Sequence, residues 1–152
     1  MIIYLTLDQA IETHSRTVDV SGGGAKGKLD MGRLESVLIH IQNDDYYPTF
    51  ADKLIHLFFA TCKFHCFEDG NKRIALSISA QFLLFNGYVF LVPEFINYME
   101  NISYHVAAGS IDKELLGEII KALLNGEEEE ESLKLKIIRA ISKEPLSCSD
   151  LA

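Results

Sequence analysis

The chain has 152 residues, 48% of them hydrophobic, a length that fits one compact domain burying roughly 70% of its unfolded surface. Twenty-two Asp and Glu against fourteen Lys and Arg give a formal net charge of -8, which repels the phosphate backbone of nucleic acid. Nucleic acid is therefore not an expected partner, and an anionic ligand needs a local basic site, for which Lys72-Arg73 is the only adjacent basic pair in the sequence.

Helical patterns dominate the first half of the chain. Thr6 and Gln9 form a capping-box pattern that predicts a helix over about 7–17, and the glycine-rich stretch 21–27 then predicts a loop. Asp30 can cap a second helix, which Asn43-Asp44-Asp45 ends. Thr49, with Asp52 three residues later, predicts a third helix that ends near Phe64.

The second half is also mainly helical. The nearly all-apolar run Ile74 to Phe85 predicts a helix that is buried on every side, directly after the polar stretch 65–70. Val89 to Val92 is the one short strand candidate. Pro93 can open a helix to about Ala108, and Ser110 can cap another that closes at Asn125-Gly126. The fold class is therefore mainly α, a helical bundle with a central buried helix after the polar stretch.

The pattern of residues 127–152 predicts a segment outside the main domain. Residues 127–131 are five consecutive Glu, typical of a solvated linker, and the apolar spacing over 132–142 predicts a short amphipathic helix. We therefore expect one domain over 1–126, followed by an acidic linker and tail helix over 127–152.

Cysteine usage and hydropathy bear on the compartment. Cys62, Cys66 and Cys148 are an odd number, and no signal-peptide pattern opens the sequence. The longest apolar runs fall well short of a membrane span. We expect a soluble cytoplasmic protein that makes no contact with membranes.

The stretch 65–73, His-Cys-Phe-Glu-Asp-Gly-Asn-Lys-Arg, carries the chemistry. A helix that begins at its end presents free N–H groups and partial positive charge, so Gly70, Asn71 and the basic pair form a phosphate site. Asp69 offers an oxygen ligand to Mg²⁺, and His65 can accept a proton from an attacking hydroxyl near neutral pH.

This stretch resembles the Fic-family signature, His-x-Phe-x-(Asp/Glu)-Gly-Asn-(Gly/Lys)-Arg. The flanks, Gly22-Gly23 with Asp30-x-Gly32 before it and Phe82-Leu83 to Asn86-Gly87-Tyr88 after it, are similar to the Doc (death-on-curing) toxin branch, over roughly residues 4 to 125. The resemblance implies His65 as general base, Phe67 as buried anchor and Asp69 as Mg²⁺ ligand. It also implies a phosphate cradle of Gly70, Asn71, Lys72 and Arg73, and a flap over the site that positions the target, built from Gly22, Gly23, Gly24, Lys26 and Gly27.

Two positions separate the chain from the adenylylating branch. Lys72 stands where that branch has glycine, and Leu76 where it has a second arginine. Doc-like toxins share both departures and are kinases that phosphorylate elongation factor Tu. We therefore expect transfer of the γ-phosphate of ATP to a protein hydroxyl, with Mg²⁺. Adenylyl transfer and a catalytically silent binding scaffold are the alternatives.

Other motifs predict less. The sequence of 22–28 nearly spells a P-loop, but Leu29 replaces the required Ser or Thr and no βαβ unit precedes it. Cys62 is expected in the core rather than in a metal site with His65 and Cys66. The other four histidines show no ligand spacing and are expected to be structural or exposed: His14, His40, His56 and His105.

Regulation is expected to come from a second protein. The resemblance implies a cognate antitoxin whose helical segment inhibits the toxin, and the chain lacks the inhibitory Ser/Thr-x-x-x-Glu-Gly/Asn motif. An alternative hypothesis places the tail helix in the antitoxin groove of its own or a neighbouring chain. A frayed appendage is the simpler interpretation.

Overall fold

The computed structural model describes residues 1–20, 31–63 and 71–142. Their elements are seven α-helices and one 3₁₀ turn, in the order α1 (Leu7–Val20), α2 (Met31–His40), α3 (Phe50–Lys63), α4 (Asn71–Phe85), η1 (Val89–Leu91), α5 (Val92–Ala108), α6 (Lys113–Asn125) and α7 (Glu131–Ser142). These residues contain no β-strand, and the mainly α fold class is confirmed.

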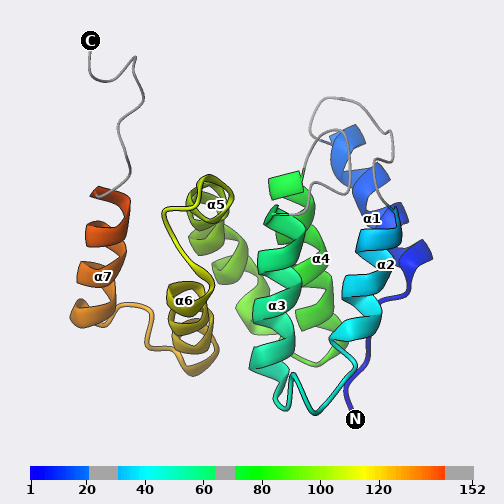
Figure 1. Ribbon diagram of the computed structural model, residues 1–152, viewed down its shortest axis with the longest axis horizontal. Coiled ribbons are helices and arrows are strands. Elements are labelled where there is room, and N and C mark those ends of the chain that lie inside the picture. The colour runs from blue at the N-terminus through cyan, green and yellow to red at the C-terminus, as the bar shows by residue number, and fades with distance from the viewer. Residues whose placement is uncertain (21–30, 64–70, 143–152) are drawn as a thin grey trace.

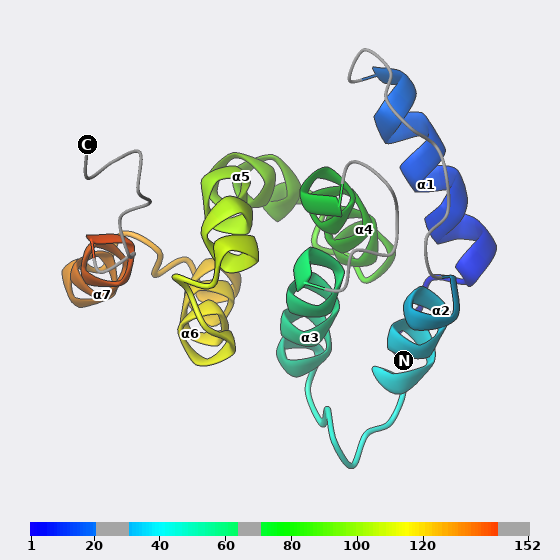
Figure 2. The same cartoon turned by 45° about the horizontal axis from the view of Figure 1, so that its top comes forward.

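Helix α4 is the centre of the bundle. It packs against α1, α3 and α5, and Figures 1 and 2 show it between these neighbours. The side chains of Ile74, Ile78 and Phe82 are fully buried. The prediction of a central helix is confirmed, but burial on every side is not, because Leu84 is 46% exposed. Helix α4 also begins three residues before the apolar run does, at Asn71.

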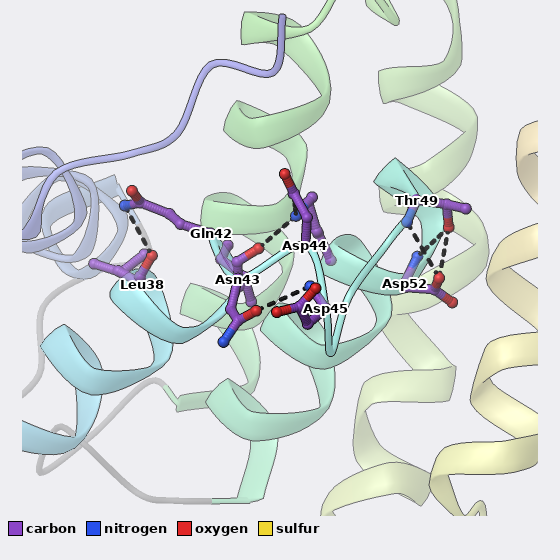
Figure 3. Close-up of polar contacts among 9 residues, drawn as sticks. Leu38, Gln42, Asn43, Asp44, Asp45, Thr49 and Asp52 are labelled. Atoms are coloured by element: carbon purple, nitrogen blue, oxygen red, sulfur yellow. Dashed lines mark hydrogen bonds and ion pairs between the residues drawn. The ribbon is translucent and has the colours of Figure 1, made fainter.

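Two of the predicted caps form as hydrogen-bonded pairs. At α1 the amide of Gln9 donates to Thr6 Oγ1 (3.2 Å) and the amide of Thr6 donates to Gln9 Oε1 (2.9 Å). At α3 the amide of Asp52 donates to Thr49 Oγ1 (3.1 Å), and the Thr49 amide and hydroxyl donate to the Asp52 carboxylate (Figure 3). Each box satisfies amides that the helix itself leaves without a partner.

The predicted cap at Ser110 is wrong. Helix α5 ends at Ala108 and is capped by Gly109, whose φ of 91° lies in the left-handed region. The amide of Ser110 closes that end by donating to the carbonyl of His105 (3.0 Å). The cap of α6 is Asp112, whose carboxylate accepts from the amide of Leu115 (2.8 Å). Ser110 therefore belongs to the end of one helix and not to the start of the next.

The strand expected over Val89 to Val92 is also wrong. Gly87, at φ 89°, turns the chain out of α4, and Val89–Leu91 then form a 3₁₀ turn that runs directly into α5. Pro93 lies in the first turn of α5, where its missing N–H costs nothing. With no neighbouring strand in the described residues, the short β-branched segment continues as helix.

The connection between α2 and α3 is held by a buried lysine. Lys53 is fully buried, and its ammonium donates to the carbonyl of Ile41 and to the carboxylate of Asp44, both at 2.8 Å. The ring of Tyr4 lies 5.6 Å from the same nitrogen. Burial alone would lower the pKa of Lys53, but the Asp44 and Tyr4 side chains hold it above its ordinary value. Lys53 thus ties the N-terminal segment, the end of α2 and α3 together.

Helix α7 packs against α6. Leu133 and Ile137 are buried, and Lys136 forms an ion pair with Glu118 of α6 (2.6 Å). Four of the five Glu residues that precede or open α7 are exposed, as expected for a solvated segment, whereas Glu128 is buried beneath Tyr98, whose hydroxyl donates to its carbonyl (3.3 Å). The domain boundary near 126 stays a prediction.

No helix within the described segments combines the length and the apolar character needed to cross a membrane.

Candidate functional site

Two helices frame the motif. The central helix α4 begins at Asn71, and α3 ends at Lys63 against its side, so residues 64–70 join the end of one helix to the start of the other. In Figure 1 the end of α1 and the start of α2 lie at this same end of the molecule, so that residues 21–30 are attached there as well. The helix ends that flank the motif and the glycine segment therefore lie at one end of the bundle.

Most of the predicted site residues lie outside the described residues. These are His65, Phe67, Asp69 and Gly70 of the motif, and Gly22, Gly23, Gly24, Lys26 and Gly27 of the glycine segment. Their roles stay predictions. Asn71, Lys72 and Arg73 are described and form the first turn of α4, where the sequence placed a helix N-terminus.

The start of α4 is locally basic. Lys72 is exposed, Arg73 is half-buried, and the first turn contains no acidic residue. The N-terminal end of a helix adds partial positive charge to these two cations. In a chain with a net charge of -8, this turn provides the positive potential that a phosphate group requires.

Cys62 is adjacent to this turn but is inert. Its side chain is fully buried in the last turn of α3, and burial raises the pKa of the thiol to about 12, although the positive charges of Lys72 and Lys63 oppose the shift. The thiolate is the reactive form, so this cysteine is not a nucleophile at neutral pH. Core packing of Cys62 is confirmed.

The structure also bears on the P-loop alternative. A P-loop follows a buried strand, whereas the segment that leads into the glycines is helix α1, which extends to Val20. Val18 to Val20, directly before the glycines, are part of that helix. The described residues therefore lack the strand that a P-loop requires before its glycines.

No three His, Cys, Asp or Glu side chains gather as a metal site within the described residues. The expected Mg²⁺ ligand, Asp69, lies outside them. Magnesium binding therefore stays a prediction. The start of α4 is basic and has no acidic residue, so it suits a phosphate group and not a metal ion.

Leu76, the second position that separates the chain from the adenylylating branch, lies one turn into α4. Its side chain is half-buried and packs against the hydrophobic core. At this position the chain therefore places an apolar contact with the core and not a second guanidinium beside the predicted phosphate site.

One cluster was missed by the sequence. His40 and His56 come from different helices, yet their rings lie 5.8 Å apart, and Tyr47 contacts both. The Nζ atom of Lys113, from α6, lies 2.9 Å from Nδ1 of His56. Since no fixed spacing joins these four residues, only the fold shows that they meet.

Comparison with known proteins agrees with the motif. The sequence model of the Fic/DOC family matches residues 4–83, which include α1, α2, α3 and most of α4. The chain is also 27% identical over 129 residues to the "Protein kinase doc" of Escherichia phage P1, an alignment that covers 82% of this chain and 98% of that protein. Because the family match spans more than half of the sequence and both helices that frame the motif, the chain belongs to the Fic/DOC family, in its Doc branch.

Proposed function

We propose that this protein is a Doc-like kinase that transfers the γ-phosphate of ATP to a hydroxyl group of a target protein. The observation that carries the proposal is the basic first turn of the central helix, with Lys72 and Arg73 and no carboxylate. The relative in phage P1, named a protein kinase, aligns over nearly its whole length and supports the same reaction.

Different residues of the motif have different roles in such a transfer. His65 accepts the proton of the target hydroxyl as its oxygen forms a bond to the γ-phosphorus, and the bond from that phosphorus to the β-phosphate oxygen breaks, so that ADP leaves. Gly70, Asn71, Lys72 and Arg73 hold the phosphates, and Asp69 would hold Mg²⁺. When bound, Mg²⁺ supplies positive charge that neutralises the phosphate oxygens.

Phosphotransfer is preferred to adenylyl transfer because of Lys72 and Leu76. A lysine in place of glycine adds volume and charge to the phosphate cradle, which favours a different placement of the nucleotide. Leu76 packs on the core, so the second arginine of the adenylylating branch has no counterpart at its position.

The cellular setting follows from the family resemblance. We propose that the protein is the toxin of a toxin-antitoxin pair, acts in the cytoplasm on a translation protein such as elongation factor Tu, and is held inactive by an antitoxin. Co-expression with a candidate antitoxin should restore growth, and a purified complex should show no transfer.

Separately labelled ATP tests the reaction. The protein is incubated in cell extract with Mg²⁺ and ATP labelled either on the γ-phosphate or on the adenine, beside a His65→Ala variant and a His14→Ala variant as a matched histidine control. Transfer of the γ-label alone, lost only in His65→Ala, is the expected result. Transfer of the adenine label would replace the kinase with an adenylyl transferase, and transfer independent of His65 would leave only a binding scaffold.

A further inference from the structure

A groove runs between α2 and α3, on the side of the bundle that faces α6. It has a volume of about 490 Å³ and is lined by Arg33, Ser36, Val37, His40 and His56. The α2 residues recur every three or four positions and so lie along one face of the helix. Figure 1 shows α3 between α2 and α6, and α3 contributes His56 to the lining of this groove, which we call the donor groove.

Tyr47 and Lys113 lie beside the donor groove, where both contact His56 of its lining. The ring of Tyr47 stacks on that of His56 at 4.7 Å, and the ammonium of Lys113 lies 5.6 Å from the Tyr47 ring and 2.9 Å from Nδ1 of His56. Within the described part of the chain, Lys113 forms no ion pair with a carboxylate. Its ammonium instead contacts the rings of His56 and Tyr47, next to the groove.

This contact fixes the protonation of His56. An ammonium can only donate, so Nδ1 of His56 accepts from Lys113 and the ring proton of the neutral imidazole is on Nε2. Burial, together with the positive charges of Lys113 and His40, lowers the pKa of His56 to about 4. His56 is thus a neutral donor at physiological pH, held in a positive local potential.

The lining of the donor groove offers donors. The guanidinium of Arg33, the hydroxyl of Ser36 and the Nε2–H of His56 line it and can donate, and the ammonium of Lys113 beside it can donate as well. Among the described residues, no carboxylate lines the groove, although Glu35 lines the hollows beside it. In a chain with eight more acidic than basic residues, such a groove is complementary to a ligand that carries only acceptors.

The position of the donor groove relates it to the protein substrate. Arg33 is in the first turn of α2, which follows directly on the glycine segment, and His40 ends the same helix. At 1.5 Å per residue the distance between them along the axis is about 10 Å, the span of about three extended residues. A substrate segment leaving the catalytic end would therefore continue along this groove.

We propose that the donor groove docks an acidic segment of the protein substrate, an inference that rests on the proposed protein kinase function. A carboxylate of the segment contacts Lys113 and His56, and its backbone lies against Val37 and the ring of Tyr47. Because the rest of the chain is acidic, this groove also selects the orientation in which an acidic partner approaches.

A binding experiment with a defined probe tests the inference. The probe is a fluorescein-labelled octapeptide of alternating Gly and Glu, compared with its Gly and Gln counterpart by fluorescence anisotropy. Lys113→Gln should weaken binding of the Glu peptide about fivefold to tenfold, which is the loss of one rim charge. Lys121→Gln, an exposed lysine on the same helix, is the matched control and should change it less than about twofold.

Two results would overturn the docking site. One is an equal loss of affinity in Lys113→Gln and Lys121→Gln, which would mean that peptide binding depends only on the net charge of the protein. The other is displacement of the peptide by inorganic phosphate at matched ionic strength, which would mean a small-anion site.

Running the label-transfer assay on the same proteins separates this inference from the proposed function. Intact γ-label transfer with no selective loss of peptide binding in Lys113→Gln removes the groove and leaves the kinase. Selective loss of peptide binding without any His65-dependent transfer removes the kinase and leaves an acidic-segment site.

Discussion

Replacing Lys53 by methionine tests whether one buried ammonium holds the connection between α2 and α3. Methionine keeps the length and apolar stem of the lysine and removes only the charged donor. The native ammonium is fully buried and donates at 2.8 Å to the carbonyl of Ile41 and to Asp44. Lys53→Met therefore leaves the buried Ile41 carbonyl without this donor and frees the carboxylate of Asp44.

The expected loss follows from these two partners. The side chain of Asp44 is 81% exposed, so water solvates it again at little cost. A buried carbonyl that loses its partner costs about 1–3 kcal/mol, and relief from desolvating the ammonium offsets part of the loss. We expect a net decrease of about 2 kcal/mol in the free energy of unfolding, a factor of about 30 in the folded-to-unfolded ratio.

Urea denaturation followed by circular dichroism measures this change. With a slope of about 2 kcal/mol per M for a small domain, the midpoint should fall by about 1 M. Asp44→Asn keeps Lys53 and should cost less than about 1 kcal/mol, because its partner is at the surface. A Lys53→Met protein as stable as the parent would refute the reasoning, since desolvation would then outweigh both hydrogen bonds.

Three further changes follow from the described residues. The pKa of His56 is lower in the folded state (about 4) than in the unfolded state (6.5), so the free energy of unfolding should fall as the pH drops from 6.5 towards 4. The expected loss is about 1–2 kcal/mol after solvent screening. In urea titrations at different pH, a His56→Gln variant should lack this part of the pH dependence. Gly109→Ala should lower the free energy of unfolding by about 1–2 kcal/mol, because the φ of Gly109 is 91°. Gly117→Ala, inside α6, should raise it by up to about 1 kcal/mol. Thermal melts in which the two variants have the opposite order of stability would contradict this. Deleting residues 127–152 should lower the melting temperature and leave γ-label transfer and antitoxin affinity unchanged, and altered transfer or affinity would instead indicate autoregulation by the tail.

Local patterns predicted the helices well where a cap and an apolar stripe agreed. Thr6 with Gln9 and Thr49 with Asp52 are reciprocal pairs within four residues, so the sequence contains the whole interaction. The start of α6 was missed because the residue that caps it depends on how α5 ends. The left-handed conformation of Gly109 makes Ser110 part of the turn that closes α5, and the next residue able to cap α6 is Asp112.

Long-range contacts account for what the sequence could not predict in the fold. Lys53 looks like an ordinary surface lysine within an amphipathic helix, and only the return of the N-terminal segment and the end of α2 encloses it. The burial of Glu128 within a run of five Glu is of the same kind, because it depends on Tyr98 of α5 lying above it.

The same distinction applies to function. The motif at 65–73 could be identified because its residues are consecutive, and the structure adds that it joins α3 to the start of the central helix. The donor groove takes its polar groups from α2, α3 and the start of α6, whose order in the sequence carries no signal. A family motif of consecutive residues is therefore recognisable from sequence here, and a cluster assembled across helices is not.

The packing of α7 limits how the tail could act on the catalytic end of its own chain. Figure 1 places α7 at the opposite side of the molecule from α1 and α2, with Leu133 and Ile137 buried against the bundle. Exposing two such side chains costs about 3–5 kcal/mol, which restricts a detached tail to roughly one molecule in a few hundred or fewer. To inhibit in cis, the tail would have to recover this energy at the catalytic end. A separate antitoxin segment can bind without detaching α7 from the bundle, so inhibition by a second protein requires less free energy in this fold than inhibition by the tail.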